Sequence, residues 1–239
     1  MSETGRDPRS TRSELLEDTL GFNLRSLRTL ADLWIRPRKV MDAVVLRDRV
    51  SYTPMVRLFL ALIGVQIAVS VLWGGYGSMI QDAIAAQMSE AQLSAYFETM
   101  GTTPDAFFSM YGNIASALHA PIVGAFTALS VFVLGAFGAK RAFAVNLNLV
   151  FATLTAGSVI GIAFLSVNIF GQTTPTWSVA VIGAAYFITW LRGLPEHIAS
   201  TRSGRIVKSA VLALTMIALV MIGGVVMHTL TAVFTVLMV

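Results

Sequence analysis

The sequence RPRKVMDAVVLRDRVSYTP, from Arg36 to Pro54, runs directly into the apolar sequence MVRLFLALIGVQIAVSVLWG, from Met55 to Gly74. The first sequence is rich in charge, whereas the second contains a single charged residue, Arg57. An α-helix rises about 1.5 Å per residue, so residues 54–74 would cover about 31 Å, the thickness of the hydrocarbon core of a bilayer. The junction therefore marks the place where the chain enters a membrane.

The overall composition supports a membrane protein. Of the 239 residues, 55% are hydrophobic and 13% are charged, and the mean hydropathy is +0.72. A soluble domain carries about 25% charged residues. Together with several long apolar stretches, these values predict an all-α fold, a polytopic membrane helical bundle with five transmembrane helices. The chain has no cysteine, which excludes disulfides, thiolate nucleophiles and cysteine-ligated metals.

The lysines and arginines fall into three groups. Eleven of the 17 lie in residues 1–57, two lie at 140–141, and four lie in 192–208. Cytoplasmic loops of membrane proteins are enriched in Lys and Arg. If all three groups are cytoplasmic, the N-terminus is cytoplasmic and the C-terminus lies on the opposite side of the membrane. The chain shows no nucleic-acid-binding module, so a nucleic-acid partner is not expected.

The same patterns divide the chain into three parts. Residues 1–19 are small and polar and predict a disordered leader. Residues 20–53 predict amphipathic and juxtamembrane helices on the cytoplasmic side, and residues 54–239 form the membrane domain. The five spans are expected at about 54–74, 121–137, 145–170, 177–191 and 209–239.

An amphipathic helix is predicted from Leu20, because apolar residues recur every three or four positions. Arg25, Arg28 and Asp32 lie on its other sides, and Pro37 ends it. Two locations remain open for the apolar face, the membrane surface or the cytoplasmic ends of the spans. The apolar positions are Phe22, Leu24, Leu27, Leu30, Leu33 and Trp34.

Several local signals predict helix ends and helix contacts elsewhere. Ser89 is a suitable N-cap for a helix that reaches Met100, and Thr103 followed by Pro104 predicts the start of the next helix. Proline at 121 is expected near the start of the second span. Two glycine pairs are also informative. Gly157 and Gly161 form a small-xxx-small face that permits close helix packing, and Gly223-Gly224 predicts a tilt or bend in the long fifth span.

No Asp, Glu, Lys or Arg lies within the predicted spans away from their ends. This pattern disfavours a proton relay or a pathway for charged substrates. No catalytic motif is present, so we expect no enzymatic activity, no cofactor and no metal. The predicted topology allows His119 and His228 to meet near the outer side. A metal site there is disfavoured relative to hydrogen bonds, because the histidine spacing matches no metal-binding motif.

The basic stretch before the first span is the main candidate binding site. A cation near an anionic membrane surface contributes about 1 kcal/mol. We therefore expect this stretch to bind phospholipid headgroups or an acidic membrane-protein partner, although the charges could equally serve only to set the topology. The candidate residues are Arg36, Arg38, Lys39, Arg47, Arg49, Tyr52 and Arg57.

An alternative function is a small transporter, channel or lipid-translocating protein with a polar path along the third span. Polar residues within spans also join helices by hydrogen bonds, and this structural role is the favoured interpretation. The candidate path residues are Gln66, Asn146, Asn148 and Asn168.

The basic stretch also resembles a family. Arg36-Pro37 and Val40, then Leu46-Arg-Asp-Arg-Val with Tyr52, Pro54 and Leu58, is similar to the segment before the first span in uncharacterised bacterial five-span inner-membrane proteins of the Yip-type superfamily. The chain has Arg47-Asp48 where that pattern has Gly-Lys. The resemblance implies a helical membrane domain with a cytoplasmic N-terminal segment, in a bacterial inner (plasma) membrane, so that the C-terminus is expected to be periplasmic. Because eukaryotic Yip-type proteins are membrane-trafficking adaptors, it also favours a non-enzymatic protein that binds lipid, another membrane protein or a second copy of itself.

Overall fold

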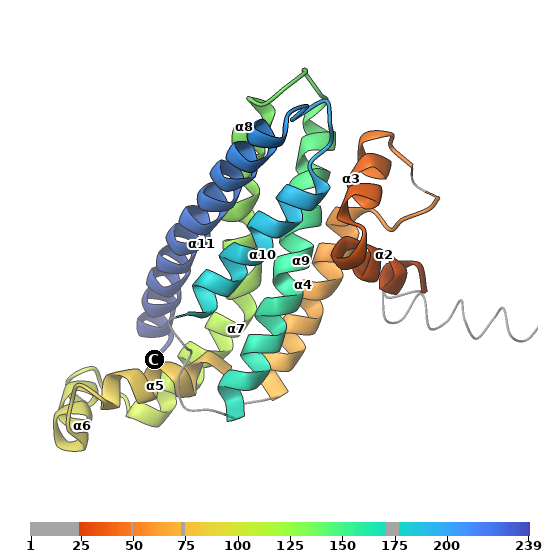
Figure 1. Cartoon of the computed structure of the whole chain (residues 1–239). Helices are drawn as coiled ribbons and strands as arrows, with labels where there is room; N and C mark the ends of the chain where they lie inside the picture. The colour runs from red at the N-terminus through yellow and green to blue at the C-terminus, as the bar shows by residue number, and fades with distance from the viewer. Residues whose placement is uncertain (1–23, 49, 73–74, 171–176) are drawn as a thin grey trace, which may run out of the picture.

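The structure is a computed structural model that describes residues 24–48, 50–72, 75–170 and 177–239, without the side chains of residues 75, 79 and 166–170. The predicted leader, the first turn of the amphipathic helix and Arg49 lie outside the described residues. All secondary structure in the described ranges is helical, which confirms the all-α fold class there. In chain order the helices are α2 (Leu24–Ile35), α3 (Pro37–Val45), α4 (Met55–Leu72), α5 (Gly75–Ala85), α6 (Glu90–Thr99), α7 (Pro104–Ala128), α8 (Ser130–Gly135), α9 (Phe143–Phe170), α10 (Ser178–Gly193) and α11 (Arg202–Met238) (Figure 1).

Four helical segments of the described chain are long and apolar enough to cross a membrane. They are α4, the α7–α8 segment Pro104–Gly135, the α9 segment Phe143–Leu165, and α11. Helix α10 is apolar but has only 16 residues. The structure thus agrees with a membrane-embedded helical protein.

The predicted helix start at Thr103-Pro104 is confirmed, and that helix continues into the second predicted span. Helix α7 starts at Pro104, and Thr103 caps it by accepting a hydrogen bond from the Ala106 amide at 3.3 Å. Pro121 lies on an exposed side of α7, and the helix continues through it. A proline removes one backbone hydrogen bond, a loss that long apolar helices tolerate when neighbouring helices and local adjustments re-satisfy the freed backbone groups.

The cap at Ser89 is confirmed. The Gln92 amide donates to the Ser89 hydroxyl at 3.3 Å, and the Gln92 side chain accepts from the Ser89 amide at 3.0 Å. This reciprocal arrangement is a capping box, and it begins α6 at Glu90.

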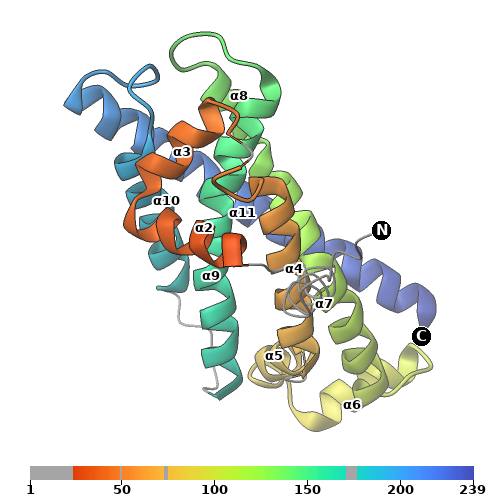
Figure 2. The same cartoon turned by 90° about the vertical axis from the view of Figure 1, so that its right-hand side faces the viewer.

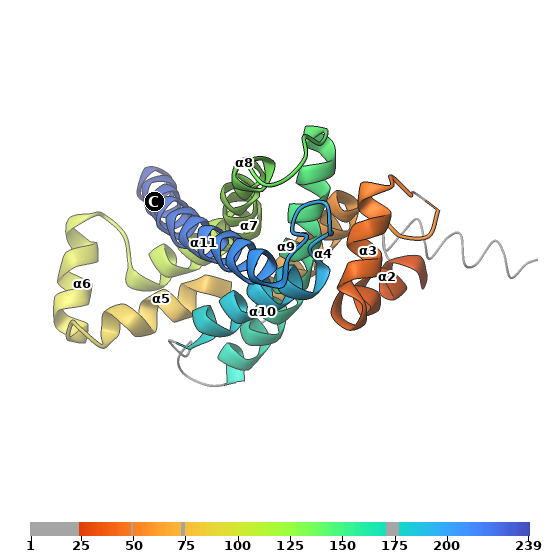
Figure 3. The same ribbon diagram turned by 45° about the horizontal axis from the view of Figure 1, so that its top comes forward.

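The long helices pack side by side. Helices α7 and α11 form the most extensive pair, α4 packs on α9, and α10 packs against both α9 and α11 (Figure 1, Figure 3). Trp190 of α10 is fully buried, and its indole N–H donates to the Met216 sulfur at 3.3 Å. The core continues through Leu134, Leu149 and Leu212.

Only one glycine of the predicted small-xxx-small face mediates a close contact. A Cβ atom at Gly157 would clash with the Tyr186 ring of α10, whereas a Cβ atom at Gly161 would meet nothing within 4 Å. The pattern therefore predicts close packing correctly for Gly157 alone. Gly161 faces away from any neighbour that the structure describes.

The described members of the three groups of cations meet at one end of the bundle, which we call the basic end and define as residues 24–48, 50–57, 136–142 and 192–208. Arg38 donates to the Leu194 carbonyl at 2.9 Å, so the first group contacts the third. The second group joins them because Gly138 lies against the His197 carbonyl, and Lys208 lies 5.6 Å from the centre of the Phe137 ring. Figure 2 shows α5 and α6, which carry acidic residues and no Lys or Arg, at the opposite end of the molecule from α8.

Candidate functional site

Helix α2 is held on the bundle by polar contacts and by only part of its apolar stripe. The Ser26 and Thr53 hydroxyls are 3.1 Å apart, and the Thr53 amide donates to the Thr29 hydroxyl at 3.1 Å. Of the predicted stripe, Leu33 is buried, but Leu24 and Leu27 are 83% and 56% exposed. Packing on the bundle therefore explains the burial of Leu33. Leu24 and Leu27, in contrast, form an exposed apolar surface.

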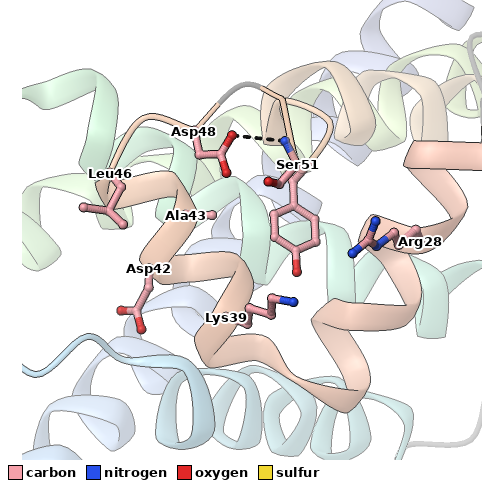
Figure 4. Close-up of a pocket in the computed structure, with 8 residues that line it drawn as sticks. Arg28, Lys39, Asp42, Ala43, Leu46, Asp48 and Ser51 are labelled. Atoms are coloured by element: carbon pink, nitrogen blue, oxygen red, sulfur yellow. Dashed lines mark hydrogen bonds between the residues drawn. The ribbon is translucent and has the colours of Figure 1, made fainter.

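A pocket of about 280 Å³ lies between α2, α3 and the turn that follows α3. We call it the α2–α3 pocket. Figure 4 shows that Arg28, from α2, and Lys39, from α3, extend toward each other across it. The lining residues are Arg28, Lys39, Asp42, Ala43, Leu46, Asp48, Ser51 and Tyr52.

The two acidic residues of this pocket already have partners. The Asp42 carboxylate accepts hydrogen bonds from Arg38 at 2.9 and 3.1 Å. The Asp48 carboxylate accepts from the amides of Val50 and Ser51 at 2.9 and 3.0 Å. Hydrogen bonds from the Ser51 side chain and from these amides lower the pKa of Asp48. The Asp48 carboxylate is thus ionised at neutral pH, and the hydrogen bonds of both carboxylates hold α3 and its turn.

The two cations of the pocket are less engaged. In the part of the chain that the structure describes, the Lys39 ammonium has no hydrogen bond or ion pair. Arg28 approaches only Asp32, at 3.9 Å, and its side chain is 63% exposed. Such an exposed pair contributes little. Asp32 itself accepts a hydrogen bond from the Tyr52 hydroxyl at 2.9 Å. The pocket therefore offers two cations to an incoming anion.

The predicted binding residues divide into distinct roles. Lys39 and Tyr52 line the pocket, but Tyr52 is only 3% exposed and forms a wall. Burial raises the pKa of Tyr52, so its hydroxyl stays protonated and donates to Asp32. Arg38 is structural, since it also lies 3.3 Å from Glu196 and fixes α3 to the segment after α10. The remaining described candidates, Arg36, Arg47 and Arg57, are exposed outside the pocket.

The sequence patterns did not identify Arg28 as a residue of the α2–α3 pocket, nor Arg192 as a residue that holds α2 in place. Arg28 faces Lys39 across the pocket because the chain turns at Arg36, between α2 and α3. This turn is a tertiary feature. Arg192 donates to the carbonyls of Trp34 and Ile35 at 3.0 and 2.8 Å and so holds the end of α2. In the sequence, Arg28 lies on the polar side of the amphipathic helix with i,i+4 spacing from Asp32, and these features by themselves indicate an ordinary helix-surface pair.

The candidate path residues are spread along the bundle. Asn146 accepts a hydrogen bond from Arg141 at 2.7 Å, and Asn148 donates to the Ala144 carbonyl at 2.8 Å, both at the start of α9. Gln66 hydrogen-bonds the Tyr76 hydroxyl near the other end of α4. The side chain of Asn168 lies outside the described residues. The three described residues thus bond to neighbours within the bundle and do not meet.

The two histidines expected at the outer side do approach each other. His119 of α7 and His228 of α11 are close enough to interact electrostatically. The His119 ring stacks on Tyr76 with centroids 4.7 Å apart, and the Tyr111 hydroxyl lies 2.5 Å from His228 Nδ1. In the described ranges no three His, Cys, Asp or Glu side chains come together as metal ligands. Aromatic and hydrogen-bonding neighbours surround this pair.

Comparison with known proteins assigns no family. The chain matches no protein-family model, no curated protein and no solved structure. Its function is therefore inferred from the geometry of the basic end, where the α2–α3 pocket combines engaged acids with available cations.

Proposed function

We propose that the chain is an integral membrane protein without enzymatic activity, and that its α2–α3 pocket binds the headgroup of an anionic phospholipid. One observation carries this proposal: Arg28 and Lys39 face the same pocket while its acids are bonded elsewhere. A phosphate can accept hydrogen bonds from both cations at once. The exposed Leu24 and Leu27 on the same helix support a position at the membrane surface.

We further propose five spans in a bacterial inner membrane, with α10 as the fourth. The packing of α10 between α9 and α11 supports this count, because its end at Gly193 lies at the basic end while α9 begins there. The positive-inside rule then places the basic end in the cytoplasm and the C-terminus in the periplasm. Membership of the Yip-type superfamily remains part of the proposal, supported by the resemblance around Arg36–Leu58.

The absence of cysteine makes this topology directly testable. Single cysteines at Ser94, Ser203 and Met238 would be probed in intact cells with a membrane-impermeant maleimide. We expect labelling of S94C and M238C from outside, and labelling of S203C only after the cells are opened. If α10 does not cross, the chain crosses four times and M238C is labelled only in opened cells. That result would contradict the five-span proposal.

The lipid site is tested with the double variant R28Q/K39Q. The full-length protein in detergent would be titrated with phosphatidylglycerol, and bound lipid would be counted by native mass spectrometry. Removing two cations should weaken binding at this site by about 25-fold, from about 1 kcal/mol for each. The matched control R9Q/R12Q removes the same charge from the segment before α2 and should bind as the wild type does.

Two results would overturn this assignment. Unchanged phosphatidylglycerol binding by R28Q/K39Q would show that the pocket binds no anionic headgroup. A protein subunit that is retained by the wild type and lost from R28Q/K39Q would instead assign the pocket to an acidic protein partner. Phosphatidylcholine, which has no net charge, should bind wild type and variant equally.

A further inference from the structure

A second pocket lies at the basic end, between the end of α10 and the first turns of α11. Its volume is about 420 Å³, and Leu191, Arg202, Arg205 and Ile206 line it. It shares no residue with the α2–α3 pocket. The lining combines two cations with two apolar side chains, a composition that suits a ligand with an anionic head and an apolar body.

The two arginines are available to a ligand. Across residues 24–239, apart from the undescribed gaps, neither the Arg202 nor the Arg205 side chain forms a hydrogen bond or an ion pair. The Arg205 Nε atom is even buried without a partner. The neighbouring cations differ in this respect, because Arg192 holds the end of α2 and Lys208 donates to the Ile198 carbonyl at 2.6 Å.

The start of α11 adds further attraction for an anion. Thr201 is the N-cap, and its hydroxyl accepts from the Gly204 amide at 3.1 Å. The amides of the first helical residues, Arg202 and Ser203, have no acceptor within the helix. The helix dipole also places partial positive charge there. Two arginines therefore line the pocket within the first turn of a helix, next to its N-terminus.

The apolar surface of the bundle begins directly beyond this point. Ile206 and Val207 are exposed on α11, followed by Val211 and Leu214, and Ile188 is exposed on α10. In a membrane-spanning helix, such residues face the acyl chains. The arginines therefore lie where the charged end of the molecule meets its lipid-facing surface, which is the depth of the phospholipid headgroups.

We propose that this pocket holds one anionic phospholipid of the leaflet at the basic end. Arg202 and Arg205 would bind its phosphate, and an acyl chain would lie along Leu191 and Ile206. This inference deepens the proposed function and depends on its membrane placement, but it uses different residues. The α2–α3 pocket is set beside the bundle, whereas this site lies on the flank of two bundle helices.

The variant R202Q/R205Q tests the site in the same phosphatidylglycerol titration. We expect it to lose one bound lipid, with affinity at this site about 25-fold lower than in the wild type, while R28Q/K39Q keeps that lipid. The control R9Q/R12Q should keep both lipids. Because Arg202 is exposed, the single variant R202Q should fold normally and show the same loss in weaker form.

The outcomes separate this inference from the proposed function. If R28Q/K39Q loses a lipid and R202Q/R205Q loses none, only the second site is overturned. If neither variant loses a lipid, both proposals fail. A further titration uses inorganic phosphate and glycerophosphoglycerol, the headgroup without acyl chains. If either binds at Arg202 and Arg205 as tightly as the lipid, the site takes a soluble phosphate and the acyl-chain contact is wrong.

Discussion

Replacing Gly223 by leucine is expected to lower the free energy of unfolding by about 3 kcal/mol, the upper end of the range for overpacked cores. Gly223 lies where α11 crosses α7, the most extensive helix pair in the described structure. A Cβ atom there would already be 3.0 Å from the Phe126 Cβ and 3.1 Å from the Val123 Cα. Because Val123 Cα is a backbone atom, a leucine can fit only if the helices separate.

The adjacent glycine is the matched control. A Cβ atom at Gly224 would meet nothing within 4 Å, so Gly224→Leu should leave stability within about 1 kcal/mol of the wild type, since leucine favours helix over glycine. Unfolding of both variants would be measured by titration with a denaturing detergent in mixed micelles. Equal losses at the two positions would show that α7 and α11 do not cross at Gly223.

Replacing Arg141 by leucine is expected to lower the free energy of unfolding by roughly 3 kcal/mol, because charged hydrogen bonds contribute about 1.5–3 kcal/mol each and this site is partly open to water. Its guanidinium donates to Asn146 at 2.7 Å and to the Leu134, Phe137 and Ala139 carbonyls at 2.9–3.0 Å. These bonds satisfy backbone carbonyl groups at and after the C-terminal end of α8, and they join this segment to α9. Leucine would leave the carbonyls and the Asn146 amide oxygen without this donor.

Lys140→Leu is the control for this prediction, since Lys140 is the exposed cation next in sequence and no described partner holds it. It should change stability by less than about 0.5 kcal/mol. The second variant Asn146→Leu should destabilise less in the R141L background than in the wild type, because the bond between the two is already lost. Additive effects of R141L and N146L would mean that Asn146 does not depend on Arg141.

The sequence by itself determined the features that depend on local pattern or on average composition. Apolar stretches and few charges indicated a helical membrane protein, and four helices of sufficient length are present. Ser89 and Thr103 begin helices because a hydroxyl N-cap acts within one turn. The three groups of cations do lie at one end of the bundle, because alternating helix directions return the chain to that end.

Tertiary packing decided which residues of each sequence pattern make contacts between helices. Gly157 meets Tyr186 while Gly161 meets nothing, and Gly223 meets α7 while Gly224 is open. Spacing shows which residues share a helix face, but only the neighbouring helix determines which of them is in contact. Helix α11 also continues through both glycines, because packing against α7 holds it there.

The candidate site depended on tertiary structure in the same way. Charge alone made Arg38 and Lys39 equivalent, yet Arg38 is held by Asp42 and Leu194 while Lys39 is open to the α2–α3 pocket. Arg28 entered the α2–α3 pocket only because α2 and α3 bring it to the same pocket as Lys39, and Arg205 lines the second pocket only because α10 places Leu191 beside the start of α11. A cation is more available to an external anion when few internal acceptors bind it, and the fold sets the positions of most of those acceptors.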